Sequence, residues 1–248
     1  MLLMEIINAV ILGFVQGLTE FLPVSSSGHL VVVGRIINLN PPGVLFEALL
    51  HAGTAAAIIW YMRHKLLSIT SKELGYIFLA SVPAGIVGIF FSNQIESLFS
   101  ILKLVGIAFL ITAFFNFQTD KYTGKRENLD VLDALFIGVM QAFAILPGIS
   151  RAGATIFAGT KMNLSKTRSA EFSFLISIPA IIGANIVEFY RHGELAGFGF
   201  EMGLAGFIAA FLSGLFAINF LMRMLSARRL KYFSYYLLVV GVLTLLFL

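Results

Sequence analysis

The sequence predicts an all-α integral membrane protein with six transmembrane helices plus two re-entrant helical hairpins, arranged as an inverted repeat. Three observations predict this fold. Hydrophobic residues make up 58% of the 248 positions and charged residues only 12%, against roughly 25% charged residues in an average soluble domain. Six long apolar stretches can cross a bilayer, and two further apolar regions are broken at their centres. The two halves of the chain also repeat one another.

The composition excludes several classes of protein. A water-soluble globule cannot bury this share of apolar side chains, so most of the chain must lie in lipid. A soluble enzyme, a nucleic-acid-binding protein, a coiled coil and a disordered tail are therefore excluded. The net charge is only +4, and the basic residues stand in short loops, which is typical of orientation signals. The chain holds no Cys, which excludes disulfides and thiolate chemistry.

The first element is an apolar hairpin over residues 3–37. Its centre, FLPVSSSGH at residues 21–29, combines Pro, Gly and three successive Ser, which stop a helix. Crossing the hydrocarbon core takes about 20 helical residues, and each flank is expected to be too short to cross comfortably. The region is therefore predicted to enter the membrane and return to the same face, with its tip supported by protein or by a wet cavity.

Three spans follow the first hairpin, and the second half of the chain has the same order. A second hairpin over residues 131–161 is broken by LPGISRAGA at residues 146–154. Each of the remaining apolar stretches is long enough to cross the membrane as a helix. The six spans are predicted at 44–62, 74–92, 101–118, 169–189, 202–222 and 232–248.

The charge of the loops agrees with this topology. A hairpin leaves the chain on the same side of the membrane, whereas three spans move it to the other side. The arrangement places most of the basic residues on one side, which the positive-inside rule assigns to the cytoplasm. These residues are Arg63, Lys65, Lys72, Lys121, Lys125, Arg126, Lys161, Lys166, Arg168, Arg223, Arg228, Arg229 and Lys231.

The repeat divides a single membrane domain, 1–248, into halves 1–124 and 125–248. The sequence ILGFVQ at 11–16 is similar to FIGVMQ at 136–141, and LP at 22–23 returns as LP at 146–147. Each half is predicted to be one hairpin plus three spans, and the halves are inverted relative to one another. Inverted repeats place ligand sites near the bilayer midplane, where broken helices present their N-termini.

The two hairpin tips hold the polar residues expected to form a site. The first tip is predicted to restart as a helix near Ser25, a favoured N-cap, and the second near Ser150, with Arg151 in its first turn. Two helix N-termini that converge beside hydroxyls and a guanidinium favour an anion, above all phosphate. The groups expected to bind it, besides Arg151, are those of Gln16, Ser25, Ser27, Gly28, Ser150 and Thr155.

The tips differ in their chemistry, which favours catalysis over symmetric transport. The first tip offers Glu20, Ser26 and His29, and the second offers Arg151. Ser26 and His29 are three positions apart and share a helical face, and a Ser beside a base is the minimal activated nucleophile. Gln16 and Glu20 are four positions apart, so their oxygen atoms can hold a hydrated divalent cation.

Structural interpretations of the tip residues stay open. A Ser-rich tip can satisfy a broken backbone, His29 can be a packing residue, and Gln16 and Gln141 can bridge helices. Arg151 stands between apolar arms, where an ionised group costs at least ~2.5 kcal/mol. A side chain that merely reaches toward the membrane surface explains that position poorly.

Three titratable residues lie outside the tips. Glu47 and Glu171 are expected in the first turns of their spans, where a carboxylate stabilises the helix dipole. His51 follows Glu47 by one turn, and either joins the site or pairs with that carboxylate.

The motifs resemble those of a known family. The segment QGLTEFLPVSSSGH at 16–29 is similar to the first signature of the undecaprenyl-diphosphate phosphatase family, the membrane phosphatases linked to bacitracin resistance. PGISRAGAT at 147–155 is similar to the second signature, and LHAGT at 50–54 and EFSFL at 171–175 resemble further family blocks. The likeness spans nearly the whole chain. Gln16 stands where many members have Glu, Ala152 where Ser is common, and Ser27 where Thr is frequent.

The resemblance implies a function. It implies hydrolysis of undecaprenyl diphosphate to undecaprenyl phosphate and phosphate, which recycles the lipid carrier for cell-wall precursors and gives bacitracin resistance. Glu20, Ser26, His29 and Arg151 match the family's essential set, with Glu20 also a ligand of a divalent cation, Mg²⁺ or Ca²⁺. It also implies a plasma (inner) membrane protein with its active site open to the outer face. The expected partners are a polyprenyl diphosphate lipid and membrane lipids, with no nucleic acid, and a homodimer is left open.

The mechanism and one competing function also stay open. Ser26 attacks the phosphorus with His29 as base, or else His29 or an activated water attacks directly, while Glu20 ligates the cation or orients His29. The competing function is a polyprenyl-phosphate transporter or flippase, because inverted repeats with broken helices are typical of alternating access. The unlike tips favour hydrolysis.

Overall fold

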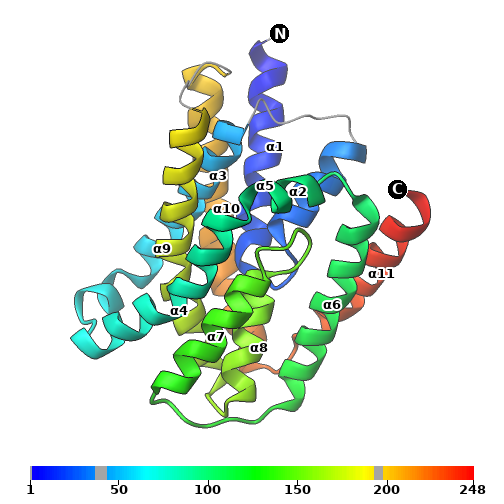
Figure 1. Cartoon of the computed structure of the whole chain (residues 1–248). Coiled ribbons are helices and arrows are strands. Elements are labelled where there is room, and N and C mark those ends of the chain that lie inside the picture. Colours follow the sequence, from blue (N-terminus) through cyan, green and yellow to red (C-terminus); the bar gives the residue numbers. More distant parts are fainter. Residues whose placement is uncertain (1, 37–43, 193–197) are drawn as a thin grey trace.

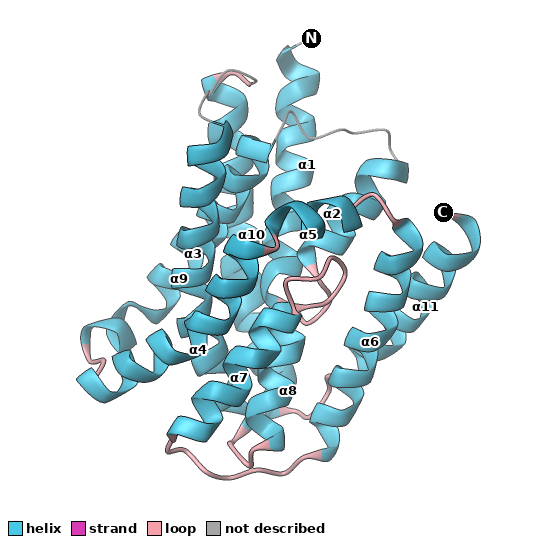
Figure 2. Ribbon diagram, viewed as in Figure 1, coloured by secondary structure: helices cyan, strands magenta, loops and turns pink. Residues whose placement is uncertain are grey.

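The computed structural model describes residues 2–36, 44–192 and 198–248, and the regular elements in these ranges are α-helices (Figures 1 and 2). Both termini lie toward the upper end of the molecule in Figure 1. The all-α prediction is therefore confirmed for the described residues. In chain order the helices are α1 (Leu2–Phe21), α2 (Ser26–Ile36), α3 (Val44–Leu67), α4 (Ser71–Phe90), α5 (Ser92–Leu98), α6 (Leu102–Lys121), α7 (Val131–Phe143), α8 (Arg151–Lys161), α9 (Lys166–His192), α10 (Phe200–Ser226) and α11 (Lys231–Phe247).

Six of the described helices are long and apolar enough to cross a membrane, namely α1, α3, α4, α6, α9 and α10. The chain is thus a multi-pass membrane protein. Five of these helices cover predicted spans, but the sixth is α1 rather than α11. The expectation that both flanks of the first hairpin are too short was wrong for α1, which has 20 residues and rises about 30 Å. The reason is that Pro23 and the Ser run fall after a full-length helix and not within it.

The remaining flanks are as short as predicted. α2 has 11 residues, α7 has 13 and α8 has 11. The short helix α5 was not predicted, and α11 has 17 residues. Each hairpin therefore consists of two helices joined by a turn that holds a Pro and a helix-capping Ser.

The closest helix packing depends on small residues. α1 packs along α10, where a side chain on Gly17 would overlap Ser213 and Ala210. α7 packs along α4 in the same way, because a Cβ on Gly138 would lie 2.7 Å from the carbonyl oxygen of Ala80. Small residues let helix backbones approach closely in a membrane, where dispersion and hydrogen bonds replace the hydrophobic effect as the source of association. α3 packs on α9 and α10, and α6 on α11.

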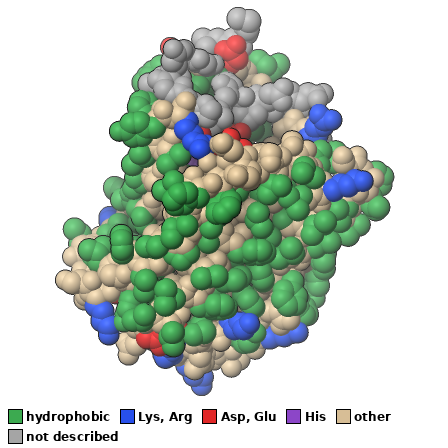
Figure 3. All heavy atoms as spheres, in the orientation of Figure 1, with side chains coloured by type: hydrophobic (Ala, Val, Ile, Leu, Met, Phe, Trp, Pro, Cys, Tyr) green, Lys and Arg blue, Asp and Glu red, His purple; other side chains and the backbone are tan. Residues whose placement is uncertain are grey.

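Charged side chains lie at the ends of the molecule and hydrophobic ones cover the middle of the face shown in Figure 3. At the end that holds the loop before α7, Arg126 donates to Asp133 at 2.6 Å and Asp130 caps α7. The N–H of Asp133, which donates to the Asp130 carboxylate, holds the pKa of Asp130 below its ordinary value. These contacts fix the start of α7 and so the position of the second hairpin.

Candidate active site

The first tip is a tight turn between α1 and α2. Val24 N donates to Leu22 O at 2.7 Å, and Ser25 has a φ of 73°, a left-handed conformation that is uncommon for a residue with a Cβ. The Ser25 hydroxyl accepts a hydrogen bond from Gly28 N at 3.3 Å, so Ser25 is the N-cap of α2 as predicted. The turn aims Ser26, the first residue of α2, back toward α1.

The second tip has an equivalent cap on α8. Gly148 has a φ of +88°, which glycine adopts without steric cost. Ser150 accepts a hydrogen bond from Gly153 N at 3.1 Å, so it caps α8 and leaves Arg151 in the first turn, as the sequence predicted.

The two tips touch one another and rest on α6. A Cβ on Gly28 would lie 3.1 Å from the Cα of Gly148 and would overlap Phe109 of α6. Asn116 donates to Pro23 O of the first tip at 2.7 Å. Thr112, one turn earlier, accepts from Ser150 N of the second tip at 3.0 Å. One face of α6 therefore holds both tips in place beside one another. The sequence gave no signal for this role.

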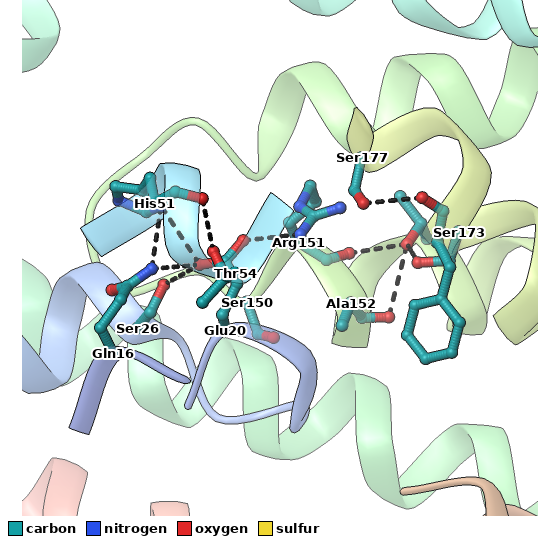
Figure 4. A network of polar contacts seen from close by, with 12 residues as sticks. Gln16, Glu20, Ser26, His51, Thr54, Ser150, Arg151, Ala152, Ser173 and Ser177 are labelled. Atoms are coloured by element: carbon teal, nitrogen blue, oxygen red, sulfur yellow. Dashed lines mark hydrogen bonds and ion pairs between the residues drawn. The ribbon is translucent and has the colours of Figure 1, made fainter. Parts of the chain in front are cut away.

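Glu20, near the end of α1, is the centre of the polar contacts between the tips (Figure 4). Its Oε1 accepts from Arg151 Nη2 at 2.6 Å, and its Oε2 accepts from the Ser26 hydroxyl at 2.6 Å and from Gln16 Nε2 at 3.0 Å. The carboxylate is buried, with 6% of the side chain exposed. The structure therefore brings together four residues that the sequence placed on two separate hairpins.

His51 of α3 joins this cluster, which settles one of the alternatives left open by the sequence. Its Nδ1 lies 2.9 Å from Gln16 Nε2 and 3.6 Å from Glu20 Oε2. An amide nitrogen only donates hydrogen bonds. Gln16 Nε2 therefore donates to the His51 ring as well as to Glu20, and His51 Nδ1 is the acceptor. In the sequence His51 stood out through its spacing from Glu47 and its place in the segment at 50–54, and the packing of α3 decides its neighbours.

His29 does not face Ser26 in this structure. Its Nδ1 lies 2.7 Å from Ser25 O and its Nε2 lies 2.7 Å from the hydroxyl of Tyr236 on α11. The sequence predicted that Ser26 and His29 share a helical face, with His29 as a candidate base, but the Ser26 hydroxyl donates to Glu20 instead. Tyr236 belongs to neither motif, and the sequence offered no signal for it.

One nitrogen of the Arg151 guanidinium makes no hydrogen bond to the described residues. Its Nη1 is buried and has no hydrogen-bond partner among the residues that the structure describes. Thr155 does not line the same space, because its hydroxyl donates to Arg151 O at 2.8 Å and contacts Ser173 at 2.6 Å. Thr155 thus supports the first turn of α8, while Nη1 remains available for an anion.

The residues outside the tips have structural roles. Gln141 donates to Ala80 O at 3.4 Å and so bridges α7 to α4, as one interpretation of the sequence had it. Glu47 lies in the first turn of α3, as predicted. Glu171 does not lie in the first turn of α9, because that helix begins earlier, at Lys166. Glu171 Oε2 lies 3.5 Å from Arg168 Nη1, and Arg168 also forms an ion pair with Glu73 of α4.

A comparison with known families shows which family the chain belongs to. The family model described as bacitracin resistance protein BacA matches residues 9–243, which include both tips and α11 up to its last turn. The chain belongs to this family.

Similar proteins cover nearly the whole chain. Undecaprenyl-diphosphatase of Carboxydothermus hydrogenoformans is 40% identical in an alignment 250 positions long, which covers 96% of this chain and 96% of that protein. Undecaprenyl-diphosphatase of Thermosipho africanus is 39% identical in an alignment of 248 positions, which covers 95% of this chain and 98% of that protein. The protein of the same name from Methanobrevibacter smithii is 36% identical in an alignment of 274 positions, which covers 97% of this chain and 96% of that protein.

The arrangement in this member of the family suits phosphoryl transfer. The hydroxyl of Ser26 donates to the Glu20 carboxylate, and contact between a hydroxyl and a proton acceptor is the arrangement that activates a nucleophile. The free nitrogen of Arg151 and the N-terminus of α8 supply the positive potential that a transferring phosphoryl group requires.

Proposed function

We propose that this protein hydrolyses undecaprenyl diphosphate to undecaprenyl phosphate and inorganic phosphate, and so recycles the lipid carrier used for cell-wall precursors. One observation carries the proposal. Glu20 accepts hydrogen bonds from Ser26 and from Arg151, each at 2.6 Å. The Glu20 carboxylate, as the base, thus contacts both the nucleophile and the phosphate-binding cation. The names of the relatives and the family's link to bacitracin resistance support the same substrate and a role in resistance.

The reaction begins with Ser26. Its hydroxyl oxygen attacks the terminal phosphorus, its proton passes to Glu20 Oε2, and the bond from that phosphorus to the bridging oxygen breaks. Undecaprenyl phosphate leaves with the bridging oxygen. Arg151 Nη1 and the N–H groups at the start of α8 bind the non-bridging oxygens, on which charge grows in the transition state. Glu20 is the base of this step because its Oε2 already accepts the Ser26 proton.

The second step releases phosphate from Ser26. Glu20 first gives the proton that it took from Ser26 to the departing undecaprenyl phosphate. A water then attacks the phosphoserine, Glu20 accepts the proton of that water, and Glu20 returns this proton to the serine oxygen as that oxygen leaves. Trapping with a radiolabelled diphosphate tests this route, which predicts a phosphoserine at residue 26 on acid quench. A Ser26→Ala variant that still turned over at the wild-type rate would instead indicate direct attack by water or by His29.

A divalent cation, Mg²⁺ or Ca²⁺, fits the residues present. Gln16 Oε1 is buried and has no partner among the described residues, and it lies on the same side chain that contacts Glu20. Mg²⁺ is commonly held by one or two carboxylates together with substrate phosphates, and Glu20 with Gln16 Oε1 would hold it in that way. When bound, the cation would neutralise charge on the diphosphate.

We propose that both hairpins are re-entrant and that the two halves form an inverted repeat. The helix pairs support this, because α1 packs on α10 as α7 packs on α4, and α3–α9 and α6–α11 each pair equivalent helices of the two halves. Gly13 and Gly138, equivalent in the repeat, face the carbonyl oxygens of Gly206 and Ala80 in these two pairs. The site would then open to the outer face of the plasma membrane.

Phosphate release by the purified protein in detergent tests the function directly. We expect release from a prenyl diphosphate, loss of release on addition of a chelator, and loss in Arg151→Ala with an unchanged unfolding temperature. A transporter or flippase would need two compartments and would release no phosphate. Normal turnover by Arg151→Ala would contradict the assignment of the anion site.

A further inference from the structure

The His29 ring is held at both nitrogens. Nδ1 lies 2.7 Å from the Ser25 carbonyl oxygen, and Nε2 lies 2.7 Å from the Tyr236 hydroxyl. Tyr236 is 207 positions away in the chain and stands on α11. The ring of His29 lies nearly parallel to that of Tyr236, 5.6 Å away between centroids, and packs against Phe109 at 5.1 Å.

These contacts fix the tautomer of the ring. A carbonyl oxygen only accepts hydrogen bonds, so Nδ1 must carry the proton that it donates to Ser25 O. Among the described residues no carboxylate lies within ion-pair distance of His29, and aromatic rings pack against it. In the neutral ring Nε2 is then an acceptor, and the Tyr236 hydroxyl donates to it.

The hydrogen bonds that run from Tyr236 through His29 end at the Ser25 carbonyl oxygen and restrain it. Ser25 adopts a φ of 73°, which is sterically disfavoured for a residue with a Cβ and persists only where the surroundings hold it. Its carbonyl accepts from His29 twice, from the backbone N at 3.2 Å and from Nδ1 at 2.7 Å. The same turn directs the next residue, Ser26, toward Glu20 Oε2.

We propose that Tyr236 is a positioning residue for Ser26 and acts through His29. Its hydroxyl donates to Nε2 and so holds the His29 ring in place, the Nδ1–H group of His29 holds the Ser25 carbonyl, and the turn holds Ser26 against Glu20. His29 is then a support of the nucleophile's backbone and not the carrier of its proton. The proposal rests on the phosphatase function proposed above, and it assigns to α11 a part in the site that neither sequence motif contains.

A pair of tyrosine variants tests the proposal. Tyr236→Phe keeps the stacked ring and removes only the hydroxyl, while Tyr235→Phe removes the hydroxyl of the neighbouring residue, whose ring meets that of Tyr232 edge to face. Loss of one hydrogen bond between neutral groups predicts a fall in kcat of about three- to tenfold for Tyr236→Phe, with KM unchanged. Tyr235→Phe should match the wild type. Equal kcat values for Tyr236→Phe and wild type would overturn the proposal.

Histidine NMR supplies a readout that does not need turnover. With ¹⁵N-labelled histidine, the His29 resonances are identified by their absence from the His29→Asn spectrum. We expect the Nδ1–H tautomer in the wild type and in both tyrosine variants, because the Ser25 carbonyl oxygen only accepts, and a changed Nε2 chemical shift in Tyr236→Phe alone, where the hydrogen bond to that nitrogen is lost. An Nε2–H ring in the wild type, or an unchanged Nε2 chemical shift in Tyr236→Phe, would contradict the inference. If the wild type released no phosphate, the proposed function would fail, while the change in the Nε2 chemical shift would still report on the hydrogen bond between Tyr236 and His29.

Two substitutions of His29 separate support from proton transfer. The Asn amide has a donor near the position of Nδ1, so His29→Asn can still bond the Ser25 carbonyl, whereas His29→Ala cannot. Support of the turn predicts that His29→Asn keeps at least about ten times the kcat of His29→Ala, with the wild-type pH profile. A role as base predicts equal losses in both variants and a missing limb in that profile.

Discussion

At the scale of single residues, the site depends on the hydrogen bonds that the Glu20 carboxylate accepts. Glu20 accepts a hydrogen bond from Ser26 on one oxygen and pairs with Arg151 through the other, both at 2.6 Å. The sequence supplied both partners, but it favoured His29 as the base because of helical spacing. Spacing fixes which side chains share a face, whereas rotamers and distant neighbours decide where their polar atoms point.

Glu20→Gln should remove catalysis and leave the fold. The amide keeps the size of the side chain but cannot accept the Ser26 proton, so kcat should fall by about 10²- to 10⁴-fold. Phosphate release from a prenyl diphosphate measures the loss, and the unfolding temperature in detergent should confirm a folded variant. Retention of more than a tenth of the wild-type kcat would assign the base to another group.

At the scale of elements, α6 and the glycines of α1 decide whether the tips meet. Asn116 holds Pro23 O of the first tip, and Thr112 holds the Ser150 amide of the second. Both side chains lie on one helical face, since they are four positions apart. α1 in turn reaches the site only because Gly17 lets it pack directly on α10.

Asn116→Ala should weaken the first tip. The Pro23 carbonyl would be left buried without its partner, which costs about 1–3 kcal/mol of folding free energy, and phosphate release should fall as Ser26 loses its position. Asn219→Ala is the matched control, because Asn219 is exposed and bonds only to its own helix at Leu215 O. Denaturant titration of both variants in detergent measures the difference, and equal stability would argue against a holding role for α6.

Gly17→Ala should separate α1 from α10. The added Cβ would overlap Ser213 and Ala210, and overpacking of this kind costs about 1–3 kcal/mol. Gly85→Ala on α4 is the control, because a Cβ there meets nothing within 4 Å and alanine favours a helix over glycine by up to ~1 kcal/mol. The unfolding temperature should therefore fall for Gly17→Ala and stay the same or rise for Gly85→Ala.

At the scale of the whole molecule, the two hairpins enter between helices contributed by both halves. α8 packs on α6 of the first half and on α9 of the second, and α1 packs on α10. This interleaving explains why neither half contains a complete site. It also makes the membrane topology a direct test of the inverted repeat.

Single cysteines can map that topology, because the chain has no native Cys. A membrane-impermeant maleimide added outside intact cells should label Ser97→Cys, in α5, and should label Lys125→Cys only after the membrane is permeabilised. The positive-inside rule places the basic loop that holds Lys125 in the cytoplasm. Labelling of both positions from the same side would contradict the predicted order of hairpins and spans.

The sequence by itself determined the membrane class, five of the six long apolar helices, and the caps at Ser25 and Ser150. These features follow from local hydrophobicity and from residues that break and cap helices, which act over a few neighbouring positions. Only the tertiary structure decided that Ser26 bonds Glu20, that Tyr236 bonds His29 and that α6 holds both tips. Such contacts join residues far apart in the chain, so helix packing and side-chain rotamers settle them, and neither is encoded in a local pattern.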